Sequence, residues 1–226
     1  MIDPSRTVAD LVLEQPSRAR VFEELGVDYC CGGKQSLSTA CDARGLAVDH
    51  AVAALESVAG APSGERDWAS APLSELCDHI VTTHHDHLRE ELPRLEGLLE
   101  KVVRAHGDGR PELSELRDTF AALRSELEEH IVTEETDLFP LVRSGGPYDA
   151  DQVAELEHDH EWAGSALAKL RDLSDGYDLD RALCNTHRAT LDGLREFELD
   201  LHQHIHEENN VLFPRVLGLQ PGAAAA

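Results

Sequence analysis

Apolar side chains recur every three or four residues along most of the chain, which is the period of an amphipathic α-helix. Residues 73–104 show this period most clearly, with apolar positions at Leu76, Ile80, Leu88, Leu92, Leu95, Leu99 and Val102. The period continues over residues 112–142, 150–173 and 179–217, and the last of these segments has room for an interruption. No segment alternates apolar and polar residues as a half-buried β-strand does. The pattern therefore predicts an all-α protein whose four long helices form an antiparallel four-helix bundle.

Shorter helical segments precede the bundle, at residues 7–14, 17–25, 36–44 and 48–58. Pro16 and Gly26 punctuate the first two, as helix starters and stoppers do. Between the second and the third segment the sequence is polar and rich in glycine, and reads Asp28-Tyr29-Cys30-Cys31-Gly32-Gly33-Lys34. This composition is typical of a tight loop and not of a helix.

A stretch of Gly, Pro and Ser separates the short segments from the long ones, Gly60-Ala61-Pro62-Ser63-Gly64-Glu65-Arg66. Such a stretch is typical of a linker at a domain boundary. We therefore expect a small helical domain over residues 1–60, a linker over 61–72, the bundle over 73–218 and a disordered tail over 219–226.

The charge of the chain limits its partners. Its 226 residues include 44 Asp and Glu against 20 Lys and Arg, which gives a net charge of −24. This charge disfavours docking on nucleic acid or on an anionic membrane, and no apolar run approaches the roughly 20 residues of a membrane span. The N-terminus lacks the basic and apolar regions of a secretory signal. Five cysteines, an odd number, do not suit an extracellular disulfide framework, so we expect a cytoplasmic protein.

An internal repeat accounts for part of an unusual total of thirteen histidines. The segment His130–Pro140 recurs 74 positions later as His204–Pro214, with six of eleven positions identical. Each copy carries a His and a Glu four residues apart, on one face of a helix. Packing explains a repeated Leu-Phe-Pro, but it does not explain a repeated His and Glu, which are costly to bury without a partner. A metal ion is such a partner, and imidazole with carboxylate suits iron, with manganese and zinc as alternatives.

A two-metal site needs further ligands from the other two long helices. His160 belongs to an apolar stripe of the third helix, whereas His158 faces elsewhere. On the first long helix His85 belongs to one stripe and His84 and His87 to another, so periodicity alone does not decide among the three. The separation of 75 positions between His85 and His160, close to that of the repeat, favours His85.

Taken together, these residues resemble the RIC (Repair of Iron Centres) family. Residues 73–217 are similar to a hemerythrin-like di-iron bundle, and Asp28–Lys34 is similar to the small domain that precedes the bundle in that family. The resemblance covers about residues 5–217. It implies a set of iron ligands in which the two glutamates bridge two irons: His85, His130, Glu134, His160, His204 and Glu208.

The resemblance also implies a function. RIC proteins are cytoplasmic and are linked to the restoration of iron–sulfur clusters damaged by nitric oxide or oxidants, by donation of iron. We therefore expect two iron ions in an oxo- and carboxylate-bridged centre, with damaged iron–sulfur proteins as partners. Nitric oxide and oxygen are expected small-molecule partners, and the chain is expected to be a monomer or a homodimer.

Other functions fit the same bundle. A reductase of nitric oxide or peroxide would turn over many times with an electron donor, a sensor would bind gas reversibly, and a structural bundle would bind no metal. Oxygen-carrying hemerythrins resemble this chain but have a second histidine one turn after the first on the third helix, where this chain has Gly164. Fewer protein ligands favour an iron donor over an oxygen carrier.

The cysteines divide into two groups. Cys30 and Cys31 lie in the glycine-rich loop near Lys34, whose positive charge we expect to lower a thiol pKa. Mainly by resemblance, we assign this pair the role of meeting the damaged client or relaying electrons. Cys41, Cys77 and Cys184 lie on apolar helical faces and are expected to be buried small hydrophobes.

Overall fold

All regular elements that the computed structural model describes are helices, over residues 1–58 and 66–219. Outside the helices it contains one isolated antiparallel bridge, between Thr7 and Ser36. The predicted all-α fold is therefore confirmed. The predicted linker falls partly outside the described residues, and the predicted tail falls outside them except for Leu219.

The short helices agree closely with the sequence pattern. They are α1 (Val8–Glu14), α2 (Arg18–Leu25), α3 (Leu37–Arg44) and α4 (Val48–Ser57). Two of them begin at a side-chain cap, since hydroxyl oxygens of Thr7 and Ser36 accept backbone N–H groups three residues later. Such caps satisfy donors that an α-helix leaves without partners at its start.

Three of the long helices contain a π-helical turn. The first consists of α5 (Leu73–Ile80), the π-turn η1 (Val81–His85) and α6 (Asp86–His106). The second consists of α7 (Pro111–Thr133), the π-turn η2 (Glu134–Leu138) and α8 (Phe139–Ser144). The third is α9 (Ala150–Leu173). The fourth consists of α10 (Asn185–Glu207), the π-turn η4 (Glu208–Leu212) and α11 (Phe213–Val216), after the separate 3₁₀-helix η3 (Leu179–Arg181).

The chain packs into two compact units. Unit 1 contains Met1–Cys77 together with His202–Ala226, and unit 2 contains Asp78–Leu201. The boundaries fall within α5 and α10, so the end of the fourth long helix is grouped with the N-terminal helices.

Unit 1 has its own apolar core, formed by residues of α1 to α4. Leu11, Phe22, Leu37 and Leu55 are completely buried in it. Backbone hydrogen bonds join the start of α1 to the glycine-rich loop, where Ala9 N–H donates to the Gly33 carbonyl at 2.8 Å. This bond holds the loop close to α1.

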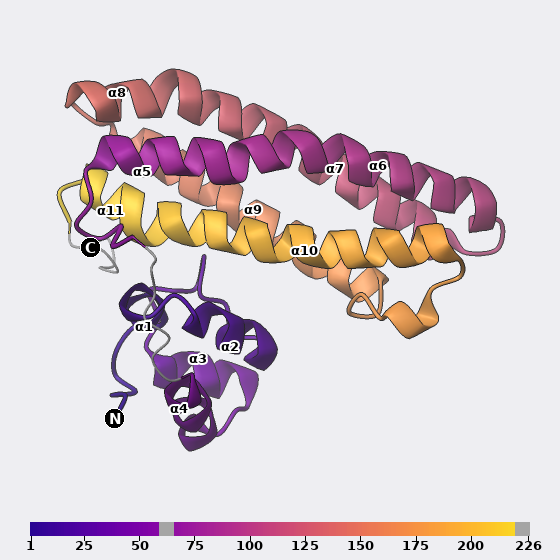
Figure 1. Ribbon diagram of the computed structural model, residues 1–226, viewed down its shortest axis with the longest axis horizontal. Coiled ribbons are helices and arrows are strands. Elements are labelled where there is room, and N and C mark those ends of the chain that lie inside the picture. Colours follow the sequence, from indigo (N-terminus) through magenta and orange to yellow (C-terminus); the bar gives the residue numbers. More distant parts are fainter. Residues whose placement is uncertain (59–65, 220–226) are drawn as a thin grey trace. The chain divides into compact units, whose positions relative to one another are not determined.

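Unit 2 is a four-helix bundle of α6, α7, α9 and the first part of α10 (Figure 1). α7 packs against both α6 and α9. Phe120 of α7 meets Phe197 of α10 edge to face, with ring centroids 5.6 Å apart. Gly193 of α10 allows a close approach to α6, because a Cβ there would lie 2.8 Å from a methyl group of Leu95. Among the described residues, no helix is both long and apolar enough to cross a lipid bilayer.

Candidate metal centre

Four of the predicted ligands lie together in the interior of unit 2. His85, His130, Glu134 and His160 have exposed fractions between 0% and 4%. Nε2 of His85 and Nε2 of His130 lie 3.4 and 3.5 Å from Oε2 of Glu134, and Nε2 of His160 lies 2.9 Å from Nε2 of His130. The ligand atoms of His130, Glu134 and His160 are all within 4.8 Å of one another. A single ion can therefore contact all three.

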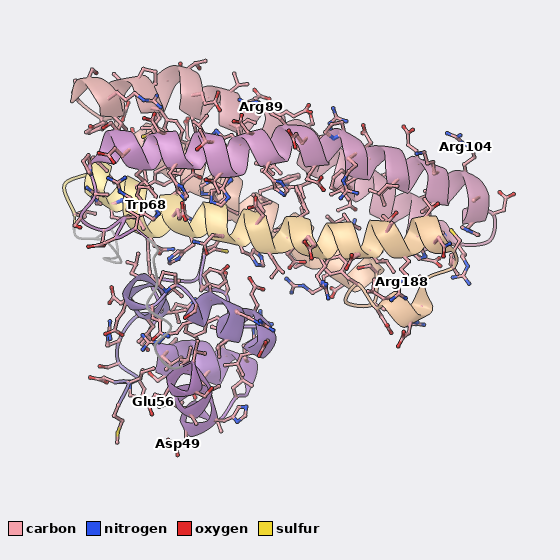
Figure 2. The ribbon with its side chains drawn as sticks, in the orientation of Figure 1. Asp49, Glu56, Trp68, Arg89, Arg104 and Arg188 are labelled. Carbon is pink, nitrogen blue, oxygen red and sulfur yellow. The ribbon has the colours of Figure 1, made fainter. Side chains whose placement is uncertain are left out.

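The opposite ring nitrogens of two of these histidines face carboxylates. Nδ1 of His85 is 2.8 Å from Oε1 of Glu135, and Nδ1 of His130 is 3.2 Å from Oδ2 of Asp159. A histidine that donates Nδ1–H to a carboxylate presents Nε2 as an acceptor, which is the usual arrangement of a metal-binding histidine. Arg89 of α6, which is labelled in Figure 2, donates to both oxygens of Glu135 at 2.8 Å each. Burial raises the pKa of Glu135, but hydrogen bonds from Arg89 and His85 outweigh it and leave that pKa below its usual value.

The chemistry around Glu134 fits a bound cation. Its side chain is completely buried, and among the described residues neither carboxylate oxygen accepts a hydrogen bond. A carboxylate in that position is costly unless a donor or a cation satisfies it. The Nε2 atoms of His130 and His160 also face each other, and two neutral acceptors need a proton or a cation between them. A metal ion would satisfy all of these groups at once.

The second His–Glu pair of the repeat lies in unit 1. His204 is 1% exposed and Glu208 is completely buried. Nε2 of His204 is 3.1 Å from Oε1 of Glu208. The second copy of the repeat therefore presents the same two ligand types, one turn apart, as the first copy does.

The π-turns coincide with the predicted ligands. η1 ends at His85, while η2 begins at Glu134 and η4 begins at Glu208. In η2 and η4 the residue before proline donates its N–H to the carbonyl of the predicted ligand glutamate, five residues earlier. Pro140 and Pro214 favour this geometry, because proline has no N–H for the carbonyl four residues earlier and its ring clashes with that carbonyl. The turn η1 has the same kind of bond, from Asp86 N–H to the Val81 carbonyl, without a proline. The repeated Leu-Phe-Pro therefore sets the backbone around each glutamate, as π-turns often do at functional sites. Sequence reasoning missed these turns, although a proline inside a helical pattern was the signal.

The competing histidines lie elsewhere. His84 is 2% exposed, but its Nδ1 is 3.1 Å from Oδ1 of Asp200. The side chain of His158 is 80% exposed, at 3.6 Å from Glu161, and His87 is only half-buried. His85, which the repeat spacing favoured among the three histidines of the first long helix, lies 3.4 Å from Glu134.

The glycine-rich loop in unit 1 brings two thiols and a carboxylate together. The Sγ atoms of Cys30 and Cys31 are 3.8 Å apart, a distance typical of two thiols and not of a disulfide. Oδ1 of Asp28 accepts the backbone N–H groups of both cysteines and the Cys30 thiol. The hydrogen bond with Cys31, burial and the charge of Asp28 raise the pKa of Cys30. The expectation that Lys34 lowers this pKa is therefore wrong for Cys30, because an acidic neighbour and burial dominate there.

The backbone of this loop is tied to η4 and to the end of α10, within unit 1. The side-chain amide of Asn210 donates to the Cys30 carbonyl at 2.9 Å, and Nδ1 of His206 lies 3.2 Å from the Tyr29 carbonyl oxygen. Sequence reasoning did not find these contacts, which join residues about 180 positions apart. They connect the cysteine loop to the same helical turn that carries Glu208.

The other cysteines are structural, but one of them differs from its predicted setting. Cys41 and Cys77 are completely buried, as expected. Cys184 is half-buried and precedes α10 instead of lying on a helical face. Its Sγ accepts the backbone N–H of His187 at 3.4 Å, so it caps the start of that helix.

Two protein families match this chain. Residues 77–216, more than half of the chain, match the family described as Hemerythrin HHE cation binding domain. Residues 4–59 match ScdA_N, described as a domain of unknown function.

Several curated relatives carry the name iron-sulfur cluster repair protein YtfE. The protein of Pectobacterium carotovorum subsp. carotovorum is 39% identical over 213 residues, which are 94% of this chain and 96% of the relative. Those of Yersinia pseudotuberculosis serotype O:1b and Escherichia coli O1:K1 / APEC are 35% and 37% identical, over 94% and 93% of this chain and 97% and 96% of the relatives. The similarity therefore extends over nearly the whole length of both chains.

Proposed function

The chain belongs to the family of proteins with a hemerythrin HHE cation binding domain, and from this premise we propose that it repairs iron–sulfur clusters damaged by nitric oxide or oxidative stress. The observation that carries the proposal is the buried cluster of His85, His130, Glu134 and His160, whose carboxylate oxygens accept no hydrogen bond among the described residues. The common name of the relatives, which match over nearly their full length, supports the repair function.

The proposed cofactor is a pair of iron ions. Four imidazoles and two carboxylates would hold the ions, those of His85, His130, Glu134, His160, His204 and Glu208. The burial of both His–Glu pairs of the repeat supports this assignment. Bound iron supplies an ion that can change its oxidation state and can be released as cargo.

The residues around the ligands control how firmly the iron is held. Glu135 and Asp159 orient the Nε2 atoms of His85 and His130 toward Glu134. Because a carboxylate can bind an ion with one oxygen or with two, Glu134 and Glu208 would allow one ion to be released while the imidazoles stay in place. This suits a protein that gives iron to a damaged cluster.

Cys30 and Cys31 are proposed to meet the damaged client protein. The raised pKa of Cys30 keeps its thiol protonated, so Cys31, which is the more exposed of the two, is the better first contact. The proposal also includes the small domain over residues 1–60, the bundle over 73–218 and a cytoplasmic location.

The test is to purify the protein without added metal and to measure its iron content and visible spectrum. We expect two irons per chain and the absorption of an oxo-bridged ferric pair. Anaerobic incubation with an apo iron–sulfur protein should then restore clusters, with stoichiometric loss of iron from the donor. Cys31→Ser should keep its iron but transfer it more slowly, whereas His50→Gln, at an exposed position of α4, should behave as wild type.

Three results would contradict the proposal. A protein with no iron, or with one zinc ion, has no di-iron centre. Many turnovers of nitric oxide or peroxide with an electron donor, without iron loss, would indicate a reductase. Reversible gas binding without iron transfer would indicate a sensor.

A further inference from the structure

His84 has the features of a metal ligand but faces away from the cluster around Glu134. It is 2% exposed, and its Nδ1 is 3.1 Å from Oδ1 of Asp200. His85, its neighbour in η1, has its own Nδ1 at 2.8 Å from Glu135. Successive residues of a helix point in different directions, so the imidazoles of His84 and His85 belong to two separate clusters of side chains. A carboxylate on Nδ1 is what orients the Nε2 atom of a metal-binding histidine.

A second imidazole, that of His79, lies beside His84 within unit 2. The two ring centroids are 5.9 Å apart with an interplanar angle of 84°, and a ring nitrogen of each lies within 4.8 Å of the other. Nδ1 of His79 is 3.1 Å from Oγ1 of Thr83. Two nitrogen ligands of one ion are about 3–4 Å apart, because each metal–nitrogen bond is about 2.0–2.1 Å long. The limit of 4.8 Å on the distance between the two ring nitrogens is close to that separation.

Asp200 supplies a negative charge that is only partly satisfied. Its Oδ1 faces His84, while its Oδ2 is buried and accepts no hydrogen bond from the described residues. The side chain as a whole is 24% exposed, so it is less deeply buried than His84. A carboxylate in this position favours a cation nearby.

We propose that His79 and His84, with Asp200 as the carboxylate that orients His84, form an additional site for one divalent transition-metal ion. The ion is held by one ring nitrogen of each histidine and by water. Two imidazoles beside a carboxylate suit Fe²⁺, Co²⁺ or Zn²⁺ better than Mg²⁺ or Ca²⁺, which prefer oxygen ligands. With fewer protein ligands than the cluster around Glu134, this site exchanges its ion more readily.

The test uses the full-length protein with its iron in place, titrated with Co²⁺. Bound Co²⁺ is followed by its visible absorption and by metal analysis after desalting, and iron is measured in the same samples. We expect wild type to bind one Co²⁺ that His79→Gln and His84→Gln do not bind. Asp200→Asn should weaken that binding by roughly 10–100-fold, as the loss of an orienting carboxylate does. His50→Gln removes an exposed imidazole of α4 and should bind Co²⁺ as wild type does.

Iron content separates this site from the main cluster. The variants should keep the iron content of wild type while they lose the additional Co²⁺. The proposal is wrong if wild type takes up no Co²⁺ beyond its iron, if His79→Gln binds it with unchanged affinity, or if Asp200→Asn loses iron instead of Co²⁺. Should His84→Gln fail to fold, His79→Gln and Asp200→Asn decide, since both positions are only half-buried.

Discussion

At the scale of single residues, Glu134 is the group whose burial most clearly opposes folding without metal. It is completely buried and accepts no hydrogen bond from the described residues, although the Nε2 atoms of His85 and His130 lie 3.4 and 3.5 Å from its Oε2 atom. A buried polar group left without a partner costs about 1–3 kcal/mol. A bound metal ion would remove this cost, and the stability of the protein therefore depends on its metal content.

Glu134→Gln tests this link, because the amide has nearly the same shape without the charge. We expect the variant to lose iron, and its metal-free form to be as stable as metal-free wild type or about 1 kcal/mol more stable. The measurements are the iron content per chain and the thermal unfolding midpoint before and after removal of metal with a chelator. Wild type should lose stability when the chelator removes its iron, whereas the variant should not respond. A metal-free variant that is several kcal/mol less stable than metal-free wild type would show that the carboxylate has a structural role instead.

At the scale of elements, Pro140 and Pro214 each follow a π-turn that begins at a predicted ligand glutamate. Without proline, an N–H at these positions could bond the carbonyl four residues earlier, and a regular α-helix could continue. The direction of the glutamate side chain relative to the rest of the helix would then change.

Pro140→Ala should therefore lower the iron content while the helix content and the unfolding midpoint stay equal or rise. Pro93→Ala is the matched control, since Pro93 lies inside α6 and the residues directly before it are α-helical, and it should keep its iron. Circular dichroism, thermal unfolding and metal analysis on the same samples provide the comparison. Full iron content in Pro140→Ala would mean that the π-turn is not needed to place Glu134.

The start of α10 makes a second prediction at this scale, which concerns pH. Nδ1 of the buried His187 accepts the Leu183 N–H at 3.2 Å, so the neutral imidazole is the form that completes the cap. Burial lowers the pKa of His187, and the nearby charges of His106 and Arg110 lower it further. The unfolded chain then binds a proton more readily than the folded one between the folded pKa and about 6.5.

Stability that His187 contributes should thus be present above about pH 6.5 and be lost as the pH falls through its folded pKa. The slope it adds to the unfolding free energy is at most about 1.4 kcal/mol per pH unit. The measurement is denaturant unfolding of the wild type and of His187→Gln between roughly pH 7.5 and 5, in steps of about 0.5 pH unit. It compares the slopes of the unfolding free energy against pH in the two proteins. Equal slopes would mean that His187 does not titrate differently in the two states.

At the scale of the whole molecule, periodicity was enough to predict the helices, and the repeat pointed to two His–Glu pairs that the structure buries. An amphipathic stripe determines which face is buried, and this predicted that His160 points inward, where its side chain is 1% exposed. It does not determine which side chains meet across two helices, since that depends on how each helix is rotated about its axis. The pairing of Asp159 with His130, of Glu135 with His85 and of Asp200 with His84 therefore needed coordinates.

The thiol of Cys30 shows the same limit for electrostatics. One nearby lysine in the sequence predicted a lowered pKa, whereas the fold buries the thiol beside Asp28 and Cys31 and raises it. A charged residue near a cysteine in the sequence does not show whether the thiol is buried, and burial has a large effect on the pKa of a cysteine.

The net charge of −24 gives a prediction for the molecule as a whole. A strongly negative protein attracts a divalent cation from a distance and raises the rate of encounter. Salt screens this attraction over about 8 Å at 0.15 M ionic strength, while contacts inside the buried cluster are screened far less. We expect the rate of Fe²⁺ uptake by the metal-free protein to fall severalfold as KCl is raised from roughly 0.02 to 0.5 M, with little change in the amount finally bound. Stopped-flow measurement of uptake under anaerobic conditions gives the rate, and metal analysis gives the endpoint. A rate independent of salt would mean that a step after encounter, such as opening of the bundle, limits uptake, and the acidic surface would then serve solubility alone.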